Sequence, residues 1–123
     1  MCEFVNFSIA KKLKEKGFNE VCYNYYEPLK HCLNQIKTPW TNKEGESYGV
    51  VTAPTISQVL KWLRKTHNIF IMVFLDDDSD NPVTFEIYKG VKCVTDYHIK
   101  YYPLDEWSKA EMDAIEYVID NLI

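Results

Sequence analysis

Apolar residues near the start of the chain recur at helical spacing and then give way to a glycine. They predict a helix over Ser8–Lys16, with Ser8 as its N-cap. Gly17 follows and supplies the left-handed residue that commonly closes a helix. With Gly17 at position C′, Leu13 and Phe18 occupy C3 and C″, whose apolar contact accompanies a Schellman cap. We therefore expect a positive φ at Gly17 and a chain that leaves the helix there.

The next segment alternates β-branched and aromatic residues with a period near two, which is typical of a strand. It covers Val21–Tyr26, and Leu29–Leu33 is the expected return strand. The stretch Ile36–Gly49 is mostly polar and contains Trp40 as its one large apolar residue. It predicts an irregular surface excursion that Trp40 holds in place.

A second helix is marked by apolar residues at i, i+3, i+4 and i+7, counted from Ile56. Thr52 or Ala53 is its expected cap, and Pro54 fits its first turn. The continuous apolar run Ile69–Leu75 follows, and such a run is typical of a central strand.

The second half of the chain predicts a hairpin and a long closing helix. Val83–Tyr88 alternates cleanly, so we expect it to pair with the preceding apolar run and to turn its odd-numbered residues inward. Val91–Tyr102 predicts one further strand, and Asp105–Leu122 predicts the last helix. The expected fold class is therefore α+β, with an antiparallel sheet of four to five strands and three helices on one face. The expected order is α-β-β-α-β-β-(β)-α, in a single domain over residues 1–123.

Composition and charge narrow the expected partners and location. The net charge is −4 and no extended basic patch occurs, which disfavours binding to duplex nucleic acid. The longest apolar run, Ile69–Leu75, is too short to span a bilayer, and the N-terminus has no signal-peptide pattern. We therefore expect a cytoplasmic protein with no membrane partner, whose four cysteines are free thiols in a reducing compartment. The cysteines form no C-x-x-C pair, so the sequence indicates neither a zinc knuckle nor a thioredoxin-like dithiol.

Residues that could carry chemistry do not form a recognisable constellation. Asp76, Asp78 and Asp80 alternate as the first ligands of an EF-hand do, but Asn81 replaces the turn glycine and Ile87 the bidentate glutamate. The pattern therefore favours a solvated hairpin tip over a metal site. The three histidines and the cysteines show no nucleophile–base spacing, and no phosphate-binding glycine motif occurs. We expect no catalytic residues, no metal and no cofactor.

Tyrosine is the distinctive residue of this chain, with nine copies. Tyrosines on half-exposed strands serve sheet packing, and they also suit binding surfaces because the ring is apolar and the hydroxyl is polar. Both faces of two predicted strands carry aromatic rings, so at least one ring must be exposed, and we predict that two or more cluster. The candidate binding residues are Tyr23, Tyr25, Tyr26, Tyr97 and Tyr101.

Three functions remain open from the residues alone, and the weakest of them is a small hydrolase that uses scattered Asp and His side chains. The first is a non-catalytic accessory protein that binds another macromolecule, either a protein partner or a second copy of itself. The alternative is a small-ligand or nucleotide-binding protein with a Tyr-lined pocket.

A resemblance adds an expectation about origin. Three segments carry it: the string Phe7–Phe18, the Tyr-rich stretch Val21–Glu27, and the helix Ala53–Arg64. Together with the closing helix they resemble a group of short uncharacterised proteins common in phages and mobile elements of Bacteroides-type gut bacteria. The resemblance implies a bacterial or phage cytoplasmic origin, and it brings no catalytic residues with it.

Overall fold

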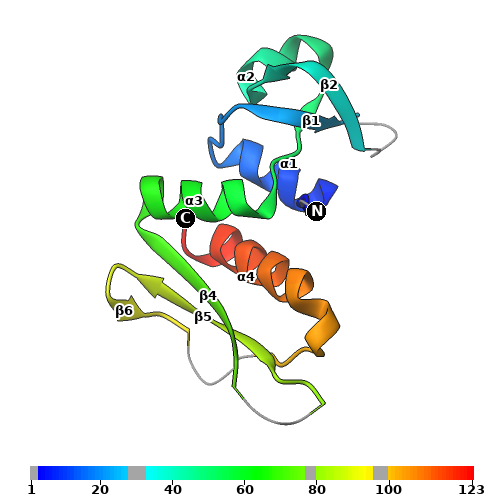
Figure 1. Cartoon of the computed structure of the whole chain (residues 1–123). Helices are drawn as coiled ribbons and strands as arrows, with labels where there is room; N and C mark the ends of the chain where they lie inside the picture. The colour runs from blue at the N-terminus through cyan, green and yellow to red at the C-terminus, as the bar shows by residue number, and fades with distance from the viewer. Residues whose placement is uncertain (1–2, 28–32, 77–79, 96–99) are drawn as a thin grey trace. The chain divides into compact units, whose positions relative to one another are not determined.

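The structure, a computed structural model, describes four stretches of the chain: residues 3–27, 33–76, 80–95 and 100–123. Its contacts divide the chain into two compact units, Met1–Gln58 and Val59–Ile123, and the boundary falls within one helix (Figure 1). The described residues form four α-helices and two antiparallel three-stranded sheets. The α+β class is confirmed, whereas the single sheet of four to five strands is replaced by two smaller sheets. That residues 1–123 form one domain stays a prediction.

Helix α1, Phe7–Glu15, opens the first unit and begins one residue earlier than expected. Its N-cap is Asn6 rather than Ser8, because the Asn6 side chain accepts the Ile9 N–H at 2.9 Å from an extended backbone. At the other end Gly17 has a φ of 88°, and the Phe18 N–H donates to the Leu13 carbonyl at 2.9 Å. The Gly17 N–H donates to the Lys14 carbonyl at 3.1 Å, so the two hydrogen bonds of a Schellman cap are both present.

Replacing Gly17 with alanine is expected to lower the free energy of unfolding by about 1 kcal/mol, because a Cβ is strained at positive φ. No atom lies within 4 Å of the position that this Cβ would take, so the cost is conformational and not a clash. Urea titration followed by circular dichroism measures it. Lys11→Ala, on the exposed side of the same helix, is the control and should change stability by less than about 0.5 kcal/mol. An unchanged or more stable Gly17→Ala protein contradicts the cap.

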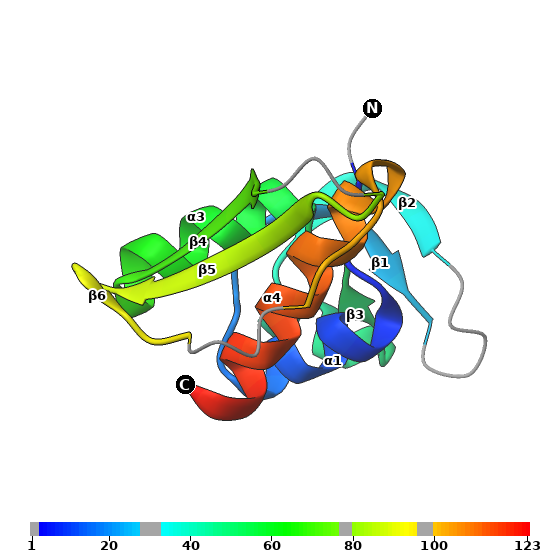
Figure 2. The same cartoon turned by 90° about the horizontal axis from the view of Figure 1, so that it is seen from below.

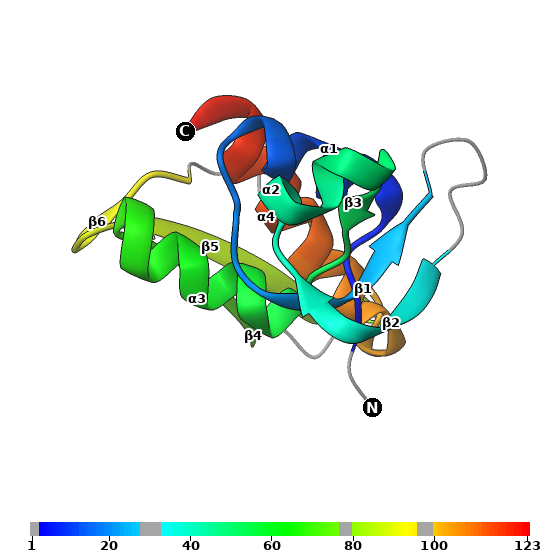
Figure 3. The same ribbon diagram turned by 90° about the horizontal axis from the view of Figure 1, so that it is seen from above.

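The sheet of the first unit has the order β2-β1-β3 (Figure 3). Its strands are β1, Cys22–Tyr26, β2, Leu33–Trp40, and β3, Val51–Thr52. The predicted strand over Val21–Tyr26 is confirmed to within one residue. The predicted return strand Leu29–Leu33 shares only its last residue with β2, and residues 29–32 lie outside the described residues. Helix α1 packs against β3 (Figure 3).

The predicted irregular excursion over Ile36–Gly49 is wrong for most of its length. Its first residues continue β2, whose pairing with β1 shifts register between Cys22 and Asn24. Helix α2, Asn42–Gly45, and the 3₁₀ turn η1, Glu46–Tyr48, follow. Two polar residues of the segment, Thr41 and Glu44, form the capping box at the start of α2, which favours a helix there over an irregular loop.

Helix α3, Ile56–His67, is confirmed, but its cap is neither Thr52 nor Ala53. Thr52 belongs to β3, and Thr55 caps the helix instead. The Thr55 N–H donates to the Gln58 side-chain oxygen at 2.9 Å, and the Gln58 N–H donates to the Thr55 hydroxyl at 3.1 Å. This reciprocal pair is a capping box. The predicted cap, at Thr52 or Ala53, was two to three residues too early.

The sheet of the second unit has the order β4-β5-β6 (Figure 2). Its strands are β4, Ile69–Leu75, β5, Val83–Lys89, and β6, Lys92–Cys93. The hairpin prediction is confirmed by an uninterrupted antiparallel register from Ile69↔Lys89 to Leu75↔Val83. The prediction that the apolar run is a central strand is wrong, because among the described strands β5 is central and β4 lies at the edge.

Alternation along β5 turns Val83, Phe85 and Ile87 into the core, as expected. Of the residues expected to face outward, Thr84 is also buried, and its hydroxyl donates to the Lys100 carbonyl at 3.2 Å. The segment that contains Lys100 therefore covers this end of β5, on the face that the alternation predicts to be exposed to solvent.

The chain closes with the 3₁₀ turn η2, Leu104–Glu106, and helix α4, Trp107–Asn121, which packs on β4 and β5. The expected helix Asp105–Leu122 is confirmed in its body, but its first acidic residues form the 3₁₀ turn. Residues 96–99 of the expected strand Val91–Tyr102 lie outside the described residues, and in the part that the structure describes the strand is reduced to β6 and a single bridge between Val83 and Tyr102. No helix among the described residues has the length and apolarity needed to cross a bilayer.

Candidate functional site

The predicted tyrosines fall into different environments. Tyr23 and Tyr101 are exposed, Tyr25 is half-buried, and Tyr26 is buried. Tyr97 lies outside the described residues. Tyr101 belongs to the second unit, where its hydroxyl donates to the Asp76 carboxylate at 2.8 Å. The prediction of two or more exposed and clustered rings is therefore tested within the first unit, on β1.

Tyr26 is a core residue. Its hydroxyl donates to the Val5 carbonyl at 2.7 Å, and its ring meets Phe7 edge-on with centroids 5.7 Å apart. Burial raises the pKa of the Tyr26 hydroxyl above its ordinary value. Because a binding surface needs accessible rings, Tyr26 is left out of the candidate site.

Three aromatic rings of the first unit form a contiguous group, which we call the aromatic cluster: Tyr25, Trp40 and Tyr48. The rings of Trp40 and Tyr48 are stacked, with centroids 4.8 Å apart and planes 7° from parallel. Tyr25 lies on the other strand of the pair, 5.7 Å from Trp40 with its plane tilted by 45°. Tyr48 is 68% exposed, so the outermost ring of the stack is open to a partner.

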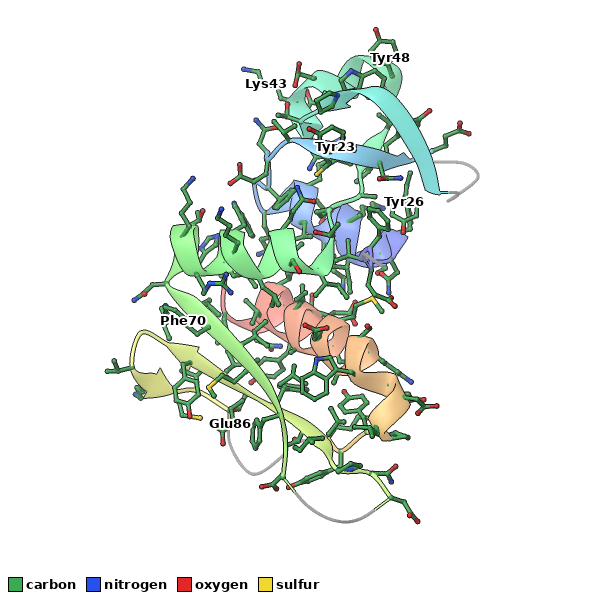
Figure 4. The ribbon with its side chains drawn as sticks, viewed as in Figure 1. Tyr23, Tyr26, Lys43, Tyr48, Phe70 and Glu86 are labelled. Carbon is green, nitrogen blue, oxygen red and sulfur yellow. The ribbon has the colours of Figure 1, made fainter. Side chains whose placement is uncertain are left out.

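Tyr23 extends this surface along β1. It stands two residues before Tyr25, so strand alternation turns both side chains to the same face, and it is 59% exposed. Figure 4 labels Tyr23 on β1 and Tyr48 on the turn that follows α2. The exposed aromatic rings of the first unit therefore come from two parts of the chain, strand β1 and the turn η1.

Helix α2 is held by hydrogen bonds at its N-terminus, and it sets the position of Tyr48 relative to Trp40. Thr41 and Glu44 form a capping box, and the Asn19 side chain accepts the Lys43 N–H at 2.8 Å. The Gly49 residue ends η1 with a φ of 67°, so the chain leaves the turn directly after Tyr48. These local bonds keep the short segment between the two stacked rings rigid.

The buried side chain of Asn42 links α2 to the rest of the first unit by hydrogen bonds. It is only 4% exposed, and its amide donates to the Phe18 carbonyl at 2.7 Å. Its side-chain oxygen accepts from both the N–H and the hydroxyl of Thr52, each at 2.9 Å. A buried amide with all of these partners fixes one orientation of α2 against β3 and against the end of α1.

The charges close to the cluster are mixed and slightly negative. Lys43, Glu44 and Glu46 are all exposed on α2 and η1, and Figure 4 shows Lys43 and Tyr48 projecting from this part of the unit. One cation beside two carboxylates does not attract a phosphate backbone, and the whole chain carries −4.

The described residues contain no group of three or more His, Cys, Asp or Glu side chains that could hold a metal ion. Residues 77–79, His31, Cys32 and His98 lie outside the described residues, so the expectations about them remain predictions. Burial raises the pKa of the Cys22 thiol to about 11, so it is protonated and unreactive at neutral pH. The Nε2 atom of His67 is buried without a hydrogen-bond partner, and the ring lies edge-on to Trp62.

Sequence reasoning missed Tyr48 and treated Trp40 only as a loop anchor. One signal was available: Thr41 followed three residues later by Glu44 is the pattern of a capping box. That pattern predicts that a helix begins directly after Trp40, so Tyr48 would follow this helix and not lie in an extended loop. The stack itself depends on the placement of η1 and has no local signature.

Comparison with protein-family models, with curated proteins and with solved structures finds no match to this chain.

Proposed function

We propose that this chain is a non-catalytic accessory protein that binds a protein partner through the aromatic cluster and Tyr23. The observation that supports this most directly is the stacked pair Trp40–Tyr48, whose outer ring, that of Tyr48, is 68% exposed. Exposed Tyr and Trp side chains contribute large contact areas with few rotatable bonds, which is why they dominate the centres of protein interfaces.

The neighbouring charges favour a protein over a nucleic acid. A strand of DNA or RNA that stacked its bases on these rings would also bring phosphates beside Glu44 and Glu46. A polypeptide has no such cost, and the exposed Lys43 can pair with an acidic residue at the rim of the contact. We retain the cytoplasm of a Bacteroides-type host or its phage as the expected setting, on the basis of the resemblance described above.

Replacing Trp40 and Tyr48 together with alanine is expected to weaken binding of the partner by about 30-fold or more. Removal of central aromatic residues from an interface costs roughly 2 kcal/mol or more, which is about a 30-fold loss of affinity. Tagged wild-type and variant proteins are incubated with lysate of a Bacteroides-type host, bound proteins are quantified by mass spectrometry, and each candidate is then titrated in purified form. Tyr117→Ala, on α4 and also exposed, is the matched control and should bind as the wild type does.

Circular dichroism of both variants must show an intact fold for the comparison to count. The proposal is contradicted if none of the captured proteins binds the wild type more tightly than the double variant in the purified titration. Native mass spectrometry of the isolated protein provides the opposing outcome: a small molecule bound by the wild type and lost in the variant favours the alternative of a ligand-binding protein.

A further inference from the structure

Strand β4 is an edge strand without the features that normally protect one. Among the described residues it pairs only with β5, and Figure 2 draws it at the side of the sheet away from β6. Its sequence, Ile69 to Leu75, contains seven apolar residues, no charge and no proline, and its register with β5 has no bulge. Edge strands usually carry a lysine, a proline or a bulge that prevents pairing with another chain.

The backbone of β4 leaves alternate residues unpaired along this edge. The Asp76 N–H donates to the Pro82 carbonyl at 2.9 Å, and the Gly90 N–H donates to the Asn68 carbonyl, also at 2.9 Å. Since hydrogen-bonded and non-hydrogen-bonded pairs alternate along an antiparallel ladder, the even-numbered residues of β4 direct their N–H and C=O groups toward β5. The corresponding groups of Ile71 and Val73 therefore point away from β5, to the free edge.

The side chains on this strand are apolar on its outer face as well. Phe70 is exposed and Met72 is 53% exposed, and both lie on the face opposite to the core residues of β5. Figure 4 labels Phe70 on β4 and Glu86 on its partner strand β5. Leu75, at the end of the strand, is exposed too.

The strand is nearly palindromic about Met72. Phe70 and Phe74 are equidistant from it, as are Ile71 and Val73, and Ile69 and Leu75. An antiparallel pair of two β4 strands related by a two-fold axis at Met72 would thus place phenylalanine against phenylalanine and branched residues against branched residues. In that register Ile71 faces Val73 of the second copy, and these are the residues whose backbone groups are unpaired.

Charge at the two ends of β4 favours the same arrangement. The exposed residues Lys65 and Lys89 lie at the Ile69 end, Lys89 being the direct partner of Ile69. Asp76 and Asp80 are exposed at the Leu75 end. Antiparallel pairing of two copies brings the acidic end of each strand beside the basic end of the other, whereas parallel pairing would place like charges together.

We propose that two copies of this chain associate through β4, antiparallel and centred on Met72, to join their second-unit sheets into one continuous sheet. The self-complementary sequence, the unpaired backbone groups and the opposite charges at the two ends select a second copy over an unrelated strand. Strand β4 and the aromatic cluster share no residue, so the dimer and the proposed protein partner are tested by different variants.

Met72→Lys tests the proposed dimer, because Met72 lies at the two-fold axis of the interface. Each copy would place an ammonium group directly opposite the same group of the other, which raises the dimer dissociation constant by about 100-fold or more. Sedimentation velocity over a range of concentrations is expected to show a dimer for the wild type and a monomer for Met72→Lys. Leu104→Lys, at a position that is 62% exposed in η2, is the matched control and should remain dimeric. Thermal melts of the three proteins verify that each is folded.

A crosslink tests the register. Met72 falls on a non-hydrogen-bonded pair at the two-fold axis, where the Cα atoms are about 4.5 Å apart and a disulfide is geometrically allowed. Met72→Cys, in a background with Cys2, Cys32 and Cys93 changed to serine, is expected to give an oxidised dimer that reduction reverses. Leu104→Cys in the same background should give none.

A wild-type protein that is monomeric up to its solubility limit overturns the proposal. So does a dimer that Met72→Lys leaves intact. A dimer that dissociates with Met72→Lys but does not crosslink through Met72→Cys overturns the two-fold register.

Discussion

Asn42→Ala is expected to lower the free energy of unfolding by about 3 kcal/mol, because it removes the partner of several buried groups at once. The Phe18 carbonyl loses the hydrogen bond from the Asn42 amide, and the N–H and hydroxyl of Thr52 lose the Asn42 side-chain oxygen that accepts from both. A buried backbone group left without a partner costs about 1 to 3 kcal/mol, and the small cavity left by alanine admits at most partial rescue by water. Equilibrium urea unfolding measures the change.

Asn121→Ala is the matched control. Its amide also donates to a backbone carbonyl, that of Tyr117 at 3.0 Å, but the contact is exposed. Water replaces an exposed hydrogen bond, so this change should cost less than about 0.5 kcal/mol. Equal losses for the two asparagines would show that the buried network of Asn42 has no special role.

The same substitution is expected to disturb the aromatic cluster. Asn42 holds α2, and α2 and η1 carry Tyr48 to its position over Trp40. Near-ultraviolet circular dichroism reports on stacked aromatic rings, so Asn42→Ala should reduce that signal under conditions in which the protein remains folded.

The second large effect is expected at Tyr102. This side chain is 1% exposed, and its hydroxyl donates to the Asp113 carboxylate on α4. Tyr102→Ala should cost about 4 kcal/mol, because it removes a buried ring and leaves a cavity in the second unit. Tyr102→Phe keeps the ring and removes only the hydrogen bond, so it should cost about 1 to 2 kcal/mol. The adjacent Tyr101 is exposed, and Tyr101→Ala in the same urea titration should lie within about 0.5 kcal/mol of the wild type.

The pH dependence of stability in the wild type and in Tyr102→Phe isolates the contribution of the Tyr102 hydroxyl. Burial, and then the hydrogen bond to Asp113, raise the pKa of Tyr102 above its ordinary value of 10.0. A group with a raised folded-state pKa contributes its full stability below the unfolded-state pKa and loses it as the pH rises. Wild-type stability should therefore fall above about pH 10, and Tyr102→Phe should remove part of that fall. An identical alkaline loss in both proteins contradicts the role of the hydroxyl.

Features that depend on a few consecutive residues were predicted well. The Schellman cap at Gly17 follows from a helix, a glycine and an apolar residue after it, and the structure has both of its hydrogen bonds. The inward set Val83, Phe85 and Ile87 follows from alternation along one strand. In both cases the conformational preference lies in the local chain, so no distant contact was needed.

Helix starts were located less well, because several residue types compete for the cap. Asn6 caps α1 in place of Ser8, and Thr55 caps α3 in place of Thr52 or Ala53. Each segment contains more than one residue that can accept the first N–H groups, and the backbone that enters the helix selects among them. The capping box of Thr41 and Glu44 carries a recognisable pattern, so α2 was predictable although it was missed.

The sequence by itself determined the α+β class, the hairpin of β4 and β5, the closing helix and the abundance of tyrosine. Only the tertiary structure decided that the apolar run of β4 lies at a sheet edge, that Tyr26 and Tyr102 are core residues, and that Trp40 meets Tyr48. The physical reason is that strand order and burial depend on neighbours distant in sequence. An apolar strand has the same pattern whether one or two strands flank it, and a tyrosine has the same side chain in the core as on a binding surface.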